Sequence, residues 1–294
     1  MLPNFLIFGA GRSGTTSLYE YLRQHPQVFM SRVKETNYFA FDGEIPDGPG
    51  AAWLRATSVT MRAAYEALFA NTGGARAIGE ASPRYLEARG TAARIHALLP
   101  DVRLIAILRH PVERAFATYL AHRRDGYDPA PTFEEALADQ DRRRQKRWPF
   151  EPFVDAGFSG RHLTEYRRLF PARQLRIYLY EDLVRDPHGL MHDLLTFLEV
   201  DASVILNLSR RYGRTGVIRN PVIRVLWRRT QRLRMKVGPL LPSTWRHRMN
   251  AWAMRDLVRP EMRPETRAAL LRLYRDDTLL LQNLLERDLS GWLR

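Results

Sequence analysis

A loop rich in glycine and hydroxyl side chains follows the first apolar residues of the chain and has the chemistry of an anion site. Gly11 and Gly14 let the backbone approach an anion closely, and the amides of residues 13–17 would point at it from a helix N-terminus. Arg12 adds a fixed positive charge, and the threonines and serines add hydrogen-bond donors. The predicted anion-binding residues are Gly11, Arg12, Ser13, Gly14, Thr15, Thr16 and Ser17.

Gly9 and Gly14, with four residues between them, have the glycine spacing of a P-loop, the motif that binds the phosphates of a nucleoside triphosphate, but Thr15 occupies the position of the P-loop lysine. Since that lysine reaches the β- and γ-phosphates, a loop without it suits an oxyanion at the 5′ end of a nucleotide. A P-loop small-molecule kinase is the nearest alternative enzyme. It would also need an aspartate at a strand end for Mg²⁺, whereas the apolar run at 102–108 ends in Arg109.

Arg109 is a second candidate for anion binding. It stands at the end of a predicted buried strand, and Pro111 behind it is typical of the first position of a helix. In open parallel sheets, ligands bind outside the carboxyl ends of the strands. We therefore expect the glycine loop and Arg109 to clamp a nucleotide that carries phosphates at both ends.

The pair Lys34 and Glu35, in the segment VKETNYF at 33–39, is a third candidate. It follows the first strand–helix unit and a short second strand, so both side chains could face the loop. A carboxylate there could take a proton from an acceptor hydroxyl. The alternative interpretation is an ion pair on the surface.

Composition excludes several classes of site. The 294 residues suffice for one large α/β domain or two small ones, and the absence of cysteine excludes disulfides, thiolate metal sites and a cysteine nucleophile. A strand that begins by residue 4 leaves no room for a signal peptide, and no run approaches the roughly 18 apolar residues of a membrane span. We expect a cytoplasmic, soluble enzyme.

The net charge of +14 is concentrated in one segment. Residues 202–255 contain thirteen Lys or Arg and no Asp or Glu, so the other 240 residues together carry a net charge of +1. A basic helix within 219–241 could lie on an anionic membrane, hold an acidic or lipid-linked acceptor, or form a solvated lid. An anion-binding or membrane-binding protein is the alternative from another class, but it leaves the first 120 residues unexplained.

The elements that position these residues alternate between strand and helix, which predicts an α/β fold with a P-loop-like central parallel sheet flanked by helices. Ser82 is the expected N-cap of a helix that Pro83 opens. The predicted strands lie at 4–9, 25–30, 75–81, 102–108 and 174–179, and the predicted helices at 14–24, 52–70, 111–120, 133–146, 187–198 and 264–287.

Six segments in order along nearly the whole chain resemble the sulfotransferases that use 3′-phosphoadenosine 5′-phosphosulfate (PAPS), most closely the bacterial and carbohydrate-type (heparan-type) branch. The resemblance implies one sulfotransferase domain, 1–294, with a core at 1–200, a basic lid or acceptor segment at 202–255, and a C-terminal helix at 264–287 packing on the core. The segments are GAGRSGTTSLYEYL, KETNYF, GEASPRYL, LRHPVERAFATYL, YEDLVRDP and LLERDLSGWL.

The resemblance also implies how the nucleotide is held. The glycine loop would bind the 5′-phosphosulfate and Arg109 the 3′-phosphate. The family serine that shares the 3′-phosphate is Ala117 here. The adjacent Thr118 points about 100° around the helix and is not a simple substitute, but it is also a candidate for binding the nucleotide. Tyr180 would lie near the nucleotide, and Arg214, in RRYGRTG, would close over it.

The implied reaction is metal-independent, in-line transfer of a sulfuryl group to an acceptor hydroxyl of a carbohydrate or glycolipid, with Glu35 as general base. Because the family lysine of the EKSP-type segment is Ala81 here, Lys34 or Arg12 would supply its charge. The expected partners are a hydroxyl-bearing small molecule, sugar or glycolipid, with peripheral contact to an anionic membrane and no nucleic acid. The acceptor pocket is expected among residues 42–60, 123–160 and 217–255.

Overall fold

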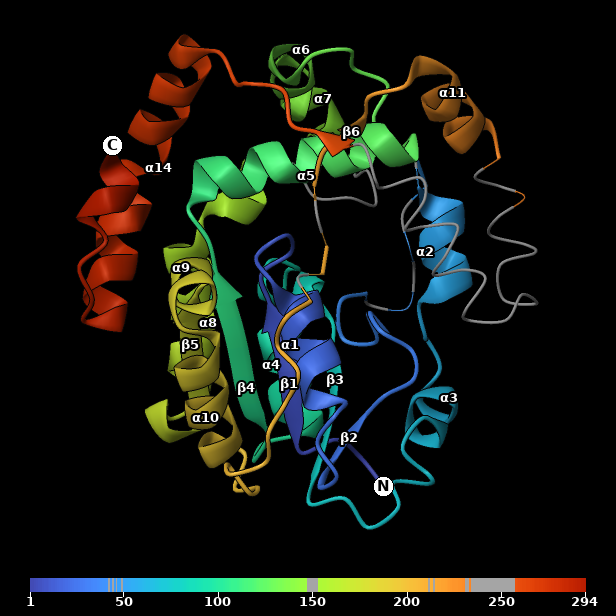
Figure 1. The fold of residues 1–294 in the computed structure, drawn as a ribbon, viewed down its shortest axis with the longest axis vertical. Helices are drawn as coiled ribbons and strands as arrows, with labels where there is room; N and C mark the ends of the chain where they lie inside the picture. Colours follow the sequence, from blue (N-terminus) through green and yellow to red (C-terminus); the bar gives the residue numbers. More distant parts are fainter. Residues whose placement is uncertain are drawn as a thin grey trace.

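The computed structural model describes residues 1–294 except 42, 44, 46, 49, 147–152, 211, 214, 231, 232 and 234–256, and except the side chain of residue 228. At its centre lies a five-stranded, wholly parallel sheet in the order β2-β3-β1-β4-β5 (Figure 1). Its strands are β1 (Phe5–Gly9), β2 (Val28–Met30), β3 (Ala77–Ala81), β4 (Arg103–Leu108) and β5 (Leu175–Leu179).

The strands are apolar along their length because both faces of the sheet are covered. Leu6 and Phe8 of β1 belong to one hydrophobic cluster, while Phe5 and Ile7, which point to the opposite face, belong to another. Continuous apolar runs are typical of parallel strands buried on both sides. The predicted α/β class with a central parallel sheet is confirmed.

Helices form a layer on each face of the sheet. Helices α1 and α10 pack in the cluster with Phe5 and Ile7, and α4 and α8 in the cluster with Leu6 and Phe8.

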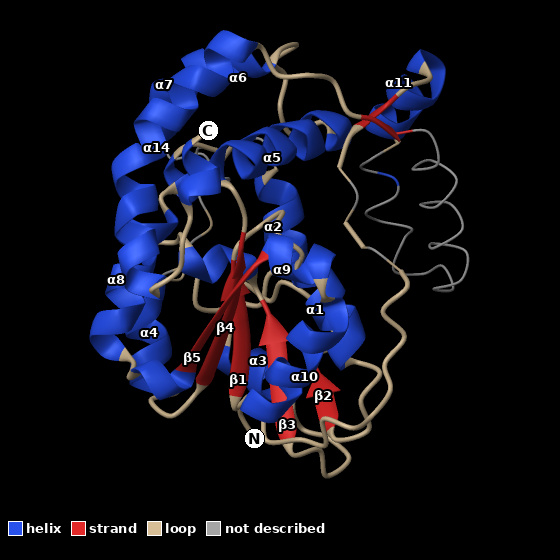
Figure 2. Cartoon of the chain, turned by 60° about the vertical axis from the view of Figure 1, so that its left-hand side comes forward, coloured by secondary structure: helices blue, strands red, loops and turns tan. Residues whose placement is uncertain are grey.

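Helix α14 packs along α8, and α5 runs across the carboxyl ends of the strands (Figures 1 and 2). The helices are α1 (Thr15–Leu22), α2 (Ala51–Thr57), α3 (Arg62–Ala67), α4 (Thr91–Leu98), α5 (Pro111–Asp125), α6 (Phe133–Ala138), α7 (Gln140–Gln145), α8 (Ser159–Leu169), α9 (Tyr180–Arg185), α10 (Pro187–Phe197), α11 (Pro221–Arg229) and α14 (Pro264–Leu285).

Two predicted helices are each divided. The helix expected over 52–70 is α2 and α3, because Ser58 is extended and the amide of Val59 bonds to the carbonyl of Thr36 at 2.8 Å. The helix expected over 133–146 is α6 and α7, which meet at Asp139. The first division is a tertiary effect, since its partner lies outside the segment.

The prediction that the Ser82 side chain caps a helix is wrong. Pro83 does open a helical turn, a 3₁₀ segment at Pro83–Leu86, but the Ser82 side chain makes no cap hydrogen bond. Its hydroxyl instead donates to the Glu80 carboxylate at 2.7 Å, since a buried carboxylate is the stronger acceptor.

The basic segment is described only in part. A short antiparallel pair joins β6 (Val217–Ile218) to β7 (Leu257–Val258), and Trp227 of α11 is buried against Ile218. The rest of the helix predicted within 219–241 lies mostly outside the described residues. Among the residues that the structure describes, no helix is long and apolar enough to cross a membrane. The division of the chain into core, basic segment and C-terminal helix stays a prediction.

Candidate active site

A cavity of about 620 Å³ opens at the carboxyl edge of the sheet. The segments that follow four neighbouring strands contribute to it: Gly11 after β1, Arg84 after β3, Arg109 after β4, and Tyr180 after β5. After β1 the chain forms β2 and β3 on one side of β1, and it then crosses over to form β4 on the other side. Ligands of open parallel sheets bind where the strand order reverses in this way.

The glycine loop forms one wall of this cavity. Gly14 precedes α1 with φ of 108°, a left-handed conformation that favours glycine, and a Cβ added there would lie 2.9 Å from Cδ2 of Leu183. The first residues of the helix, Thr15 and Thr16, line the cavity beside Gly11 and Arg12. Their position at a helix N-terminus is the one expected for anion binding.

Ser13 and Ser17 are buried and do not line the cavity. The Ser13 hydroxyl is 3.4 Å from the Gly11 carbonyl oxygen, and the Ser17 hydroxyl accepts from the amide of Tyr212 at 3.3 Å. Their side chains therefore shape the loop and attach it to residues near 212. A contact of their backbone amides with an anion stays a prediction.

Arg12 connects the glycine loop with the segment near residue 214. Its Nη2 donates to the hydroxyl of Thr215 at 3.2 Å, while its Nε is buried without a hydrogen-bond partner among the described residues. Burial, followed by the charge of Arg124, lowers the pKa of Arg12 to about 10. Arg214 itself lies outside the described residues, but its neighbours Gly213 and Thr215 line the cavity.

Arg109 lies beneath the loop. Its Nη1 donates to the carbonyl oxygen of Arg12 at 3.2 Å, and its guanidinium carbon is 4.9 Å from the centre of the Tyr180 ring. Both residues line the cavity, and their contact with a nucleotide stays a prediction. Thr118 also lines it, with its hydroxyl donating to the Arg114 carbonyl at 2.9 Å, whereas Ala117 is 1% exposed and does not line it.

Glu35 is the predicted base, and it faces the same cavity. Burial by itself would raise the pKa of Glu35, but the charge and the hydrogen bond of Lys34, at 2.6 Å from Nζ to Oε1, outweigh it and lower the pKa below the ordinary value. The charges of Arg84 and Arg12 act in the same direction. Lys34 does not line the cavity, so its effect on the site passes through Glu35.

Backbone strain is concentrated at this site. Arg12, Glu35 and Asn37 line the cavity with φ of 64°, 64° and 52°, in the left-handed region that non-glycine residues rarely adopt. Hydrogen bonds hold this conformation: the amide of Glu35 donates to the Ala81 carbonyl at 2.9 Å, and that of Asn37 to the Ser82 hydroxyl at 3.1 Å. Such residues persist only where the surroundings fix them, which happens mostly at functional sites.

Comparisons with known proteins show the family of the chain. The model named Sulfotransferase family matches residues 3–203. The chain belongs to the sulfotransferase family. It is similar to the human heparan sulfate glucosamine 3-O-sulfotransferase 3B1, with 32% identity over 200 residues, which cover 67% of this chain and 46% of that protein. It is also 27% identical over 222 residues to a Drosophila melanogaster bifunctional heparan sulfate N-deacetylase/N-sulfotransferase, which covers 72% of this chain and 21% of that protein.

Solved structures extend the similarity over the full length. The sulfotransferase from Alicyclobacillus acidocaldarius is 29% identical with a TM-score of 0.79, covering 100% of both chains. A mouse sulfotransferase complexed with PAP shares the fold at 12% identity and a TM-score of 0.50, covering 97% of this chain and 89% of that one. By contrast, the chain spans about half the length of the curated heparan sulfate 3-O-sulfotransferases that it matches.

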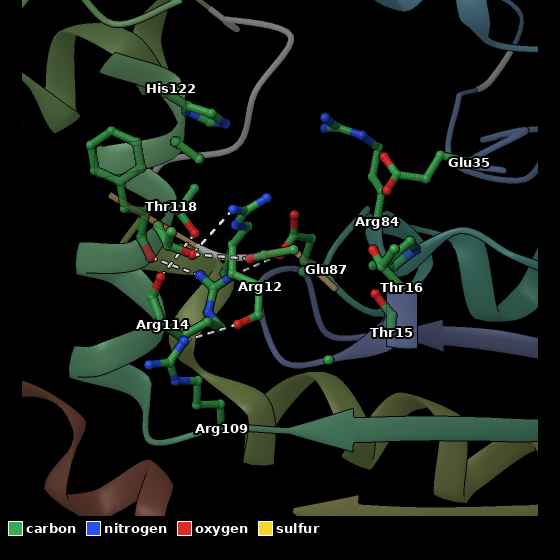
Figure 3. Close-up of a pocket in the computed structure, with 18 of the residues that line it drawn as sticks. Arg12, Thr15, Thr16, Glu35, Arg84, Glu87, Arg109, Arg114, Thr118 and His122 are labelled. Carbon is green, nitrogen blue, oxygen red and sulfur yellow. Dashed lines mark hydrogen bonds and ion pairs between the residues drawn. The ribbon is translucent and has the colours of Figure 1, made fainter. Parts of the chain in front are cut away.

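The sulfotransferase cavity also contains ionisable residues that the sequence did not indicate. Figure 3 shows Arg84 beside Glu35, on the side of the pocket away from Arg109. Burial raises the pKa of Glu87 despite the charge of Arg114, whose Nη1 is 3.6 Å from its Oε2. Ala81 occupies the position of the family lysine. Arg84, three residues later, is the positively charged residue of this segment that lines the cavity.

One helix face supplies several of the residues that the sequence did not indicate. Arg114, His122 and Asp125 of α5 line the cavity, and Arg114 and His122 stand four residues on either side of Thr118, which the sequence already indicated. Their spacing is that of a single helix face, so this signal was present in the sequence. Burial, followed by the charge of Arg12, lowers the pKa of His122 to about 3, which leaves the ring neutral.

A buried carboxylate fixes the segment between β3 and Glu35. Glu80 is completely buried, and its oxygens accept hydrogen bonds from Tyr85 at 2.6 Å, Ser82 at 2.7 Å and Tyr65 at 3.2 Å. Because Ser82 in turn holds the amide of Asn37, this network connects the core of the sheet to the strained segment that carries Glu35.

Proposed function

We propose that the protein transfers a sulfuryl group from PAPS to a hydroxyl of a carbohydrate or glycolipid acceptor, without a metal ion. One observation carries this proposal: a single cavity brings together the lysine-free glycine loop, Arg109 and the ionised Glu35. The glycine loop and Arg109 could bind the 5′- and 3′-phosphates of the donor. The carboxylate of Glu35 could remove the proton from the acceptor hydroxyl. Family membership supports the same reaction.

The residues present fit an anionic nucleotide. The buried Nε of Arg12 lacks a partner among the described residues, and a buried charged donor of this kind is stabilised by an anion. The loop residues Gly11 to Thr16 would hold the 5′-phosphosulfate, Arg109 with Thr118 the 3′-phosphate, and Tyr180 the nucleotide beside Arg109. Arg214 keeps its proposed role over the nucleotide. When bound, PAPS supplies an activated sulfuryl group.

Glu35 would act as the general base. Its carboxylate takes the proton of the acceptor hydroxyl while that oxygen bonds to sulfur and the bond from sulfur to the 5′-phosphate oxygen breaks. Lys34 keeps Glu35 ionised through Oε1. Arg12 and the loop amides stabilise the negative charge on the leaving phosphate and the sulfuryl oxygens, and such preorganised donors are a large contribution to catalysis.

The acceptor side of the cavity favours a ring-shaped molecule. Trp53 and Tyr127, from two of the regions predicted to surround the acceptor, line the cavity. Aromatic faces of this kind can stack on a sugar ring, and the curated relatives are named as heparan sulfate sulfotransferases. A cytoplasmic location and a peripheral membrane contact through residues 202–255 are part of the proposal and can be tested by cell fractionation and vesicle sedimentation.

Thermal unfolding with 3′,5′-adenosine bisphosphate, beside ATP with and without Mg²⁺, tests the donor. A ligand of the native state at 100 times its dissociation constant adds about 2.7 kcal/mol of stability, which raises the midpoint clearly. We expect stabilisation by the bisphosphate, followed by transfer of ³⁵S from labelled PAPS to a heparan-type oligosaccharide. Stabilisation by Mg-ATP but not by the bisphosphate would replace the proposal with a kinase.

A further inference from the structure

One side of helix α11 is apolar although it faces solvent. Val222, Val225 and Leu226 are 73%, 49% and 56% exposed. A helix turns by about 100° per residue, which places these three side chains on one side of it, the outer face of α11. Figure 2 shows α11 at the outer edge of the molecule, beyond the end of α5. Single exposed apolar residues are common on protein surfaces, but contiguous ones indicate an interaction site.

The opposite side of α11 attaches the helix to the rim of the cavity. Trp227 is buried and packs with Ile218 of β6 and with Ile223. β6 begins two residues after Thr215, β7 is followed directly by Arg259, and both of these residues line the cavity. None of the described side chains of α11 lines the cavity itself. The helix therefore lies beside the site and does not form its wall.

The charges around the outer face are positive. Arg219 and Arg229 are exposed, and Arg229 stands seven residues after Val222, so it lies on the same side of the helix. Arg224 is half-buried. The ion pairs of the described residues include none of these three arginines. Since residues 202–255 contain no Asp or Glu, no carboxylate of this segment can balance their charge.

An anionic bilayer is the partner that fits both the apolar residues and the charge. Valine and leucine side chains can enter the boundary of the acyl chains while the arginines remain among the lipid phosphates. A second copy of the chain, related by a two-fold axis, would bring the same arginines against each other. A nucleic acid would bind the arginines through its phosphates but leave the apolar residues without a partner.

We propose that the outer face of α11, together with Arg219 and Arg229, seats the protein on the surface of an anionic lipid bilayer. This inference names the surface for the proposed membrane contact. It rests on the proposed function only in its consequence: with α11 on the bilayer, the rim of the cavity lies near the headgroups, where the sugar of a glycolipid acceptor stands.

Sedimentation of the full chain with vesicles tests the role of the charge. The probes are vesicles of phosphatidylcholine alone and vesicles of phosphatidylcholine and phosphatidylglycerol in equal amounts. We expect the wild type to prefer the anionic vesicles. An arginine near such a surface contributes about fivefold to affinity, so the double variant Arg219→Gln and Arg229→Gln should bind them about 25-fold more weakly. Arg219→Lys with Arg229→Lys keeps the charge and should keep the binding.

The matched control for the arginines is Arg167→Gln with Arg168→Gln, which removes two exposed arginines of α8. We expect this control to bind the anionic vesicles like the wild type. The melting temperature of each variant without ligand checks its folding.

Leu226→Asn tests the apolar residues. Burial of a leucine side chain corresponds to about tenfold or more in affinity, and we expect a loss of that size with anionic vesicles. Ile205→Asn is the matched control, because it changes a side chain that is 95% exposed outside α11, and it should bind like the wild type. Neither residue lines the cavity, so stabilisation by 3′,5′-adenosine bisphosphate should be unchanged in both variants.

A fluorescent label shows which face meets the bilayer. Because the chain contains no cysteine, a polarity-sensitive fluorophore can be attached at Val222→Cys alone. Its emission should shift to the blue when anionic vesicles are added, and the same label at Ile205→Cys should show no shift.

Equal binding to both kinds of vesicle, or equal effects of Leu226→Asn and Ile205→Asn, would overturn the inference, while stabilisation by the bisphosphate would still support sulfuryl transfer. A dimer of the wild type that Leu226→Asn dissociates, measured by analytical ultracentrifugation, would assign the outer face to a second copy and would also overturn it. Binding to anionic vesicles through α11 without stabilisation by the bisphosphate would support the inference and overturn the proposed reaction.

Discussion

The ammonium group of Lys34 donates a hydrogen bond of 2.6 Å to one carboxylate oxygen of Glu35, its neighbour in sequence. The Glu35 backbone is in the left-handed region, with φ of 64°. The pair therefore combines a strained backbone with an ion pair at the edge of the cavity, and Lys34 sets the charge state of the proposed base without lining the cavity itself.

Removal of Lys34 should shift the acidic limb of the pH–rate profile. Lys34 lowers the pKa of Glu35 against the effect of burial, so Lys34→Ala should raise that pKa. A base must be deprotonated to act, and the sulfuryl transfer rate should therefore fall at a higher pH than in the wild type. Lys34→Arg keeps the charge and is the control. A limb that stays in place in Lys34→Ala, measured as kcat against pH, would show that Lys34 does not control Glu35.

Replacement of Glu35 itself should affect turnover and spare donor binding. Glu35→Gln cannot accept the proton, so we expect kcat with PAPS to fall by about 10²- to 10⁴-fold, the usual contribution of general base catalysis. Binding of 3′,5′-adenosine bisphosphate should remain within a factor of about two, because the proposed role of Glu35 is toward the acceptor and not the donor. Glu66→Gln, which changes a carboxylate that pairs with Arg62 outside the cavity, is the matched control. A kcat unaffected in Glu35→Gln would assign the base elsewhere, with Glu87 as the next carboxylate of the cavity.

The sequence predicts the part of the site that consecutive residues encode. The glycine loop, Arg109 and Pro111 each follow from an apolar strand, a turn and a helix start, all of which are local signals. The order of the strands and the meeting of the loop with Arg109 follow from the rule for parallel sheets. The loop residues Gly11 and Arg12 and the strand-end residue Arg109 line the cavity where they were expected.

The rest of the site depends on packing between distant segments. Arg259 reaches the cavity only because β7 pairs with β6 and Glu113 holds its side chain. The break between α2 and α3 depends on a bond from Val59 to Thr36, and no local pattern encodes it. Tertiary contacts of this kind override local propensity.

The Glu80 network should contribute measurably to stability. Glu80→Ala removes the acceptor of the hydroxyls of Tyr85, Tyr65 and Ser82, and a lost hydrogen bond to a charged group costs about 1.5–3 kcal/mol. The hydroxyls of Tyr85 and Ser82 keep Thr36 as a partner at 3.0 and 3.4 Å. We expect the free energy of unfolding in urea to fall by about 3 kcal/mol or more. Glu80→Gln keeps one oxygen acceptor and should lose clearly less. Equal losses in both variants would contradict this prediction, because Gln fills the same space as Glu, and they would mean that a single amide oxygen cannot replace the carboxylate in this network.

The same residue should make stability depend on pH. Burial raises the pKa of Glu80, although its hydrogen bonds lower it in part. A carboxyl whose folded pKa is raised stabilises the fold below its unfolded pKa, and this stabilisation is lost as the pH rises through the folded pKa. The wild type should therefore gain stability relative to Glu80→Gln as the pH is lowered toward about 4, the range of an unfolded glutamate. A difference that is constant with pH, in urea titrations at several pH values, would contradict this prediction.

Gly14 and Gly11 form a matched pair in the anion loop. Gly14 has a φ of 108°, and a Cβ there would lie 2.9 Å from Leu183 and 3.3 Å from Ile107, whereas a Cβ at Gly11 would meet nothing within 4 Å. Overpacking of a core costs about 1–3 kcal/mol, and a left-handed backbone adds about 1 kcal/mol for a residue other than glycine. We therefore expect Gly14→Ala to lower the free energy of unfolding by about 2–4 kcal/mol in the absence of ligand, and Gly11→Ala to leave it within about 0.5 kcal/mol. Urea unfolding measures both, and equal stabilities of the two variants would show that the loop adapts to a side chain at Gly14.

Since Leu183 lies on α9, the helix that begins at Tyr180, Gly14→Ala should also displace this helix and with it the Tyr180 ring. We therefore expect Gly14→Ala to weaken binding of 3′,5′-adenosine bisphosphate.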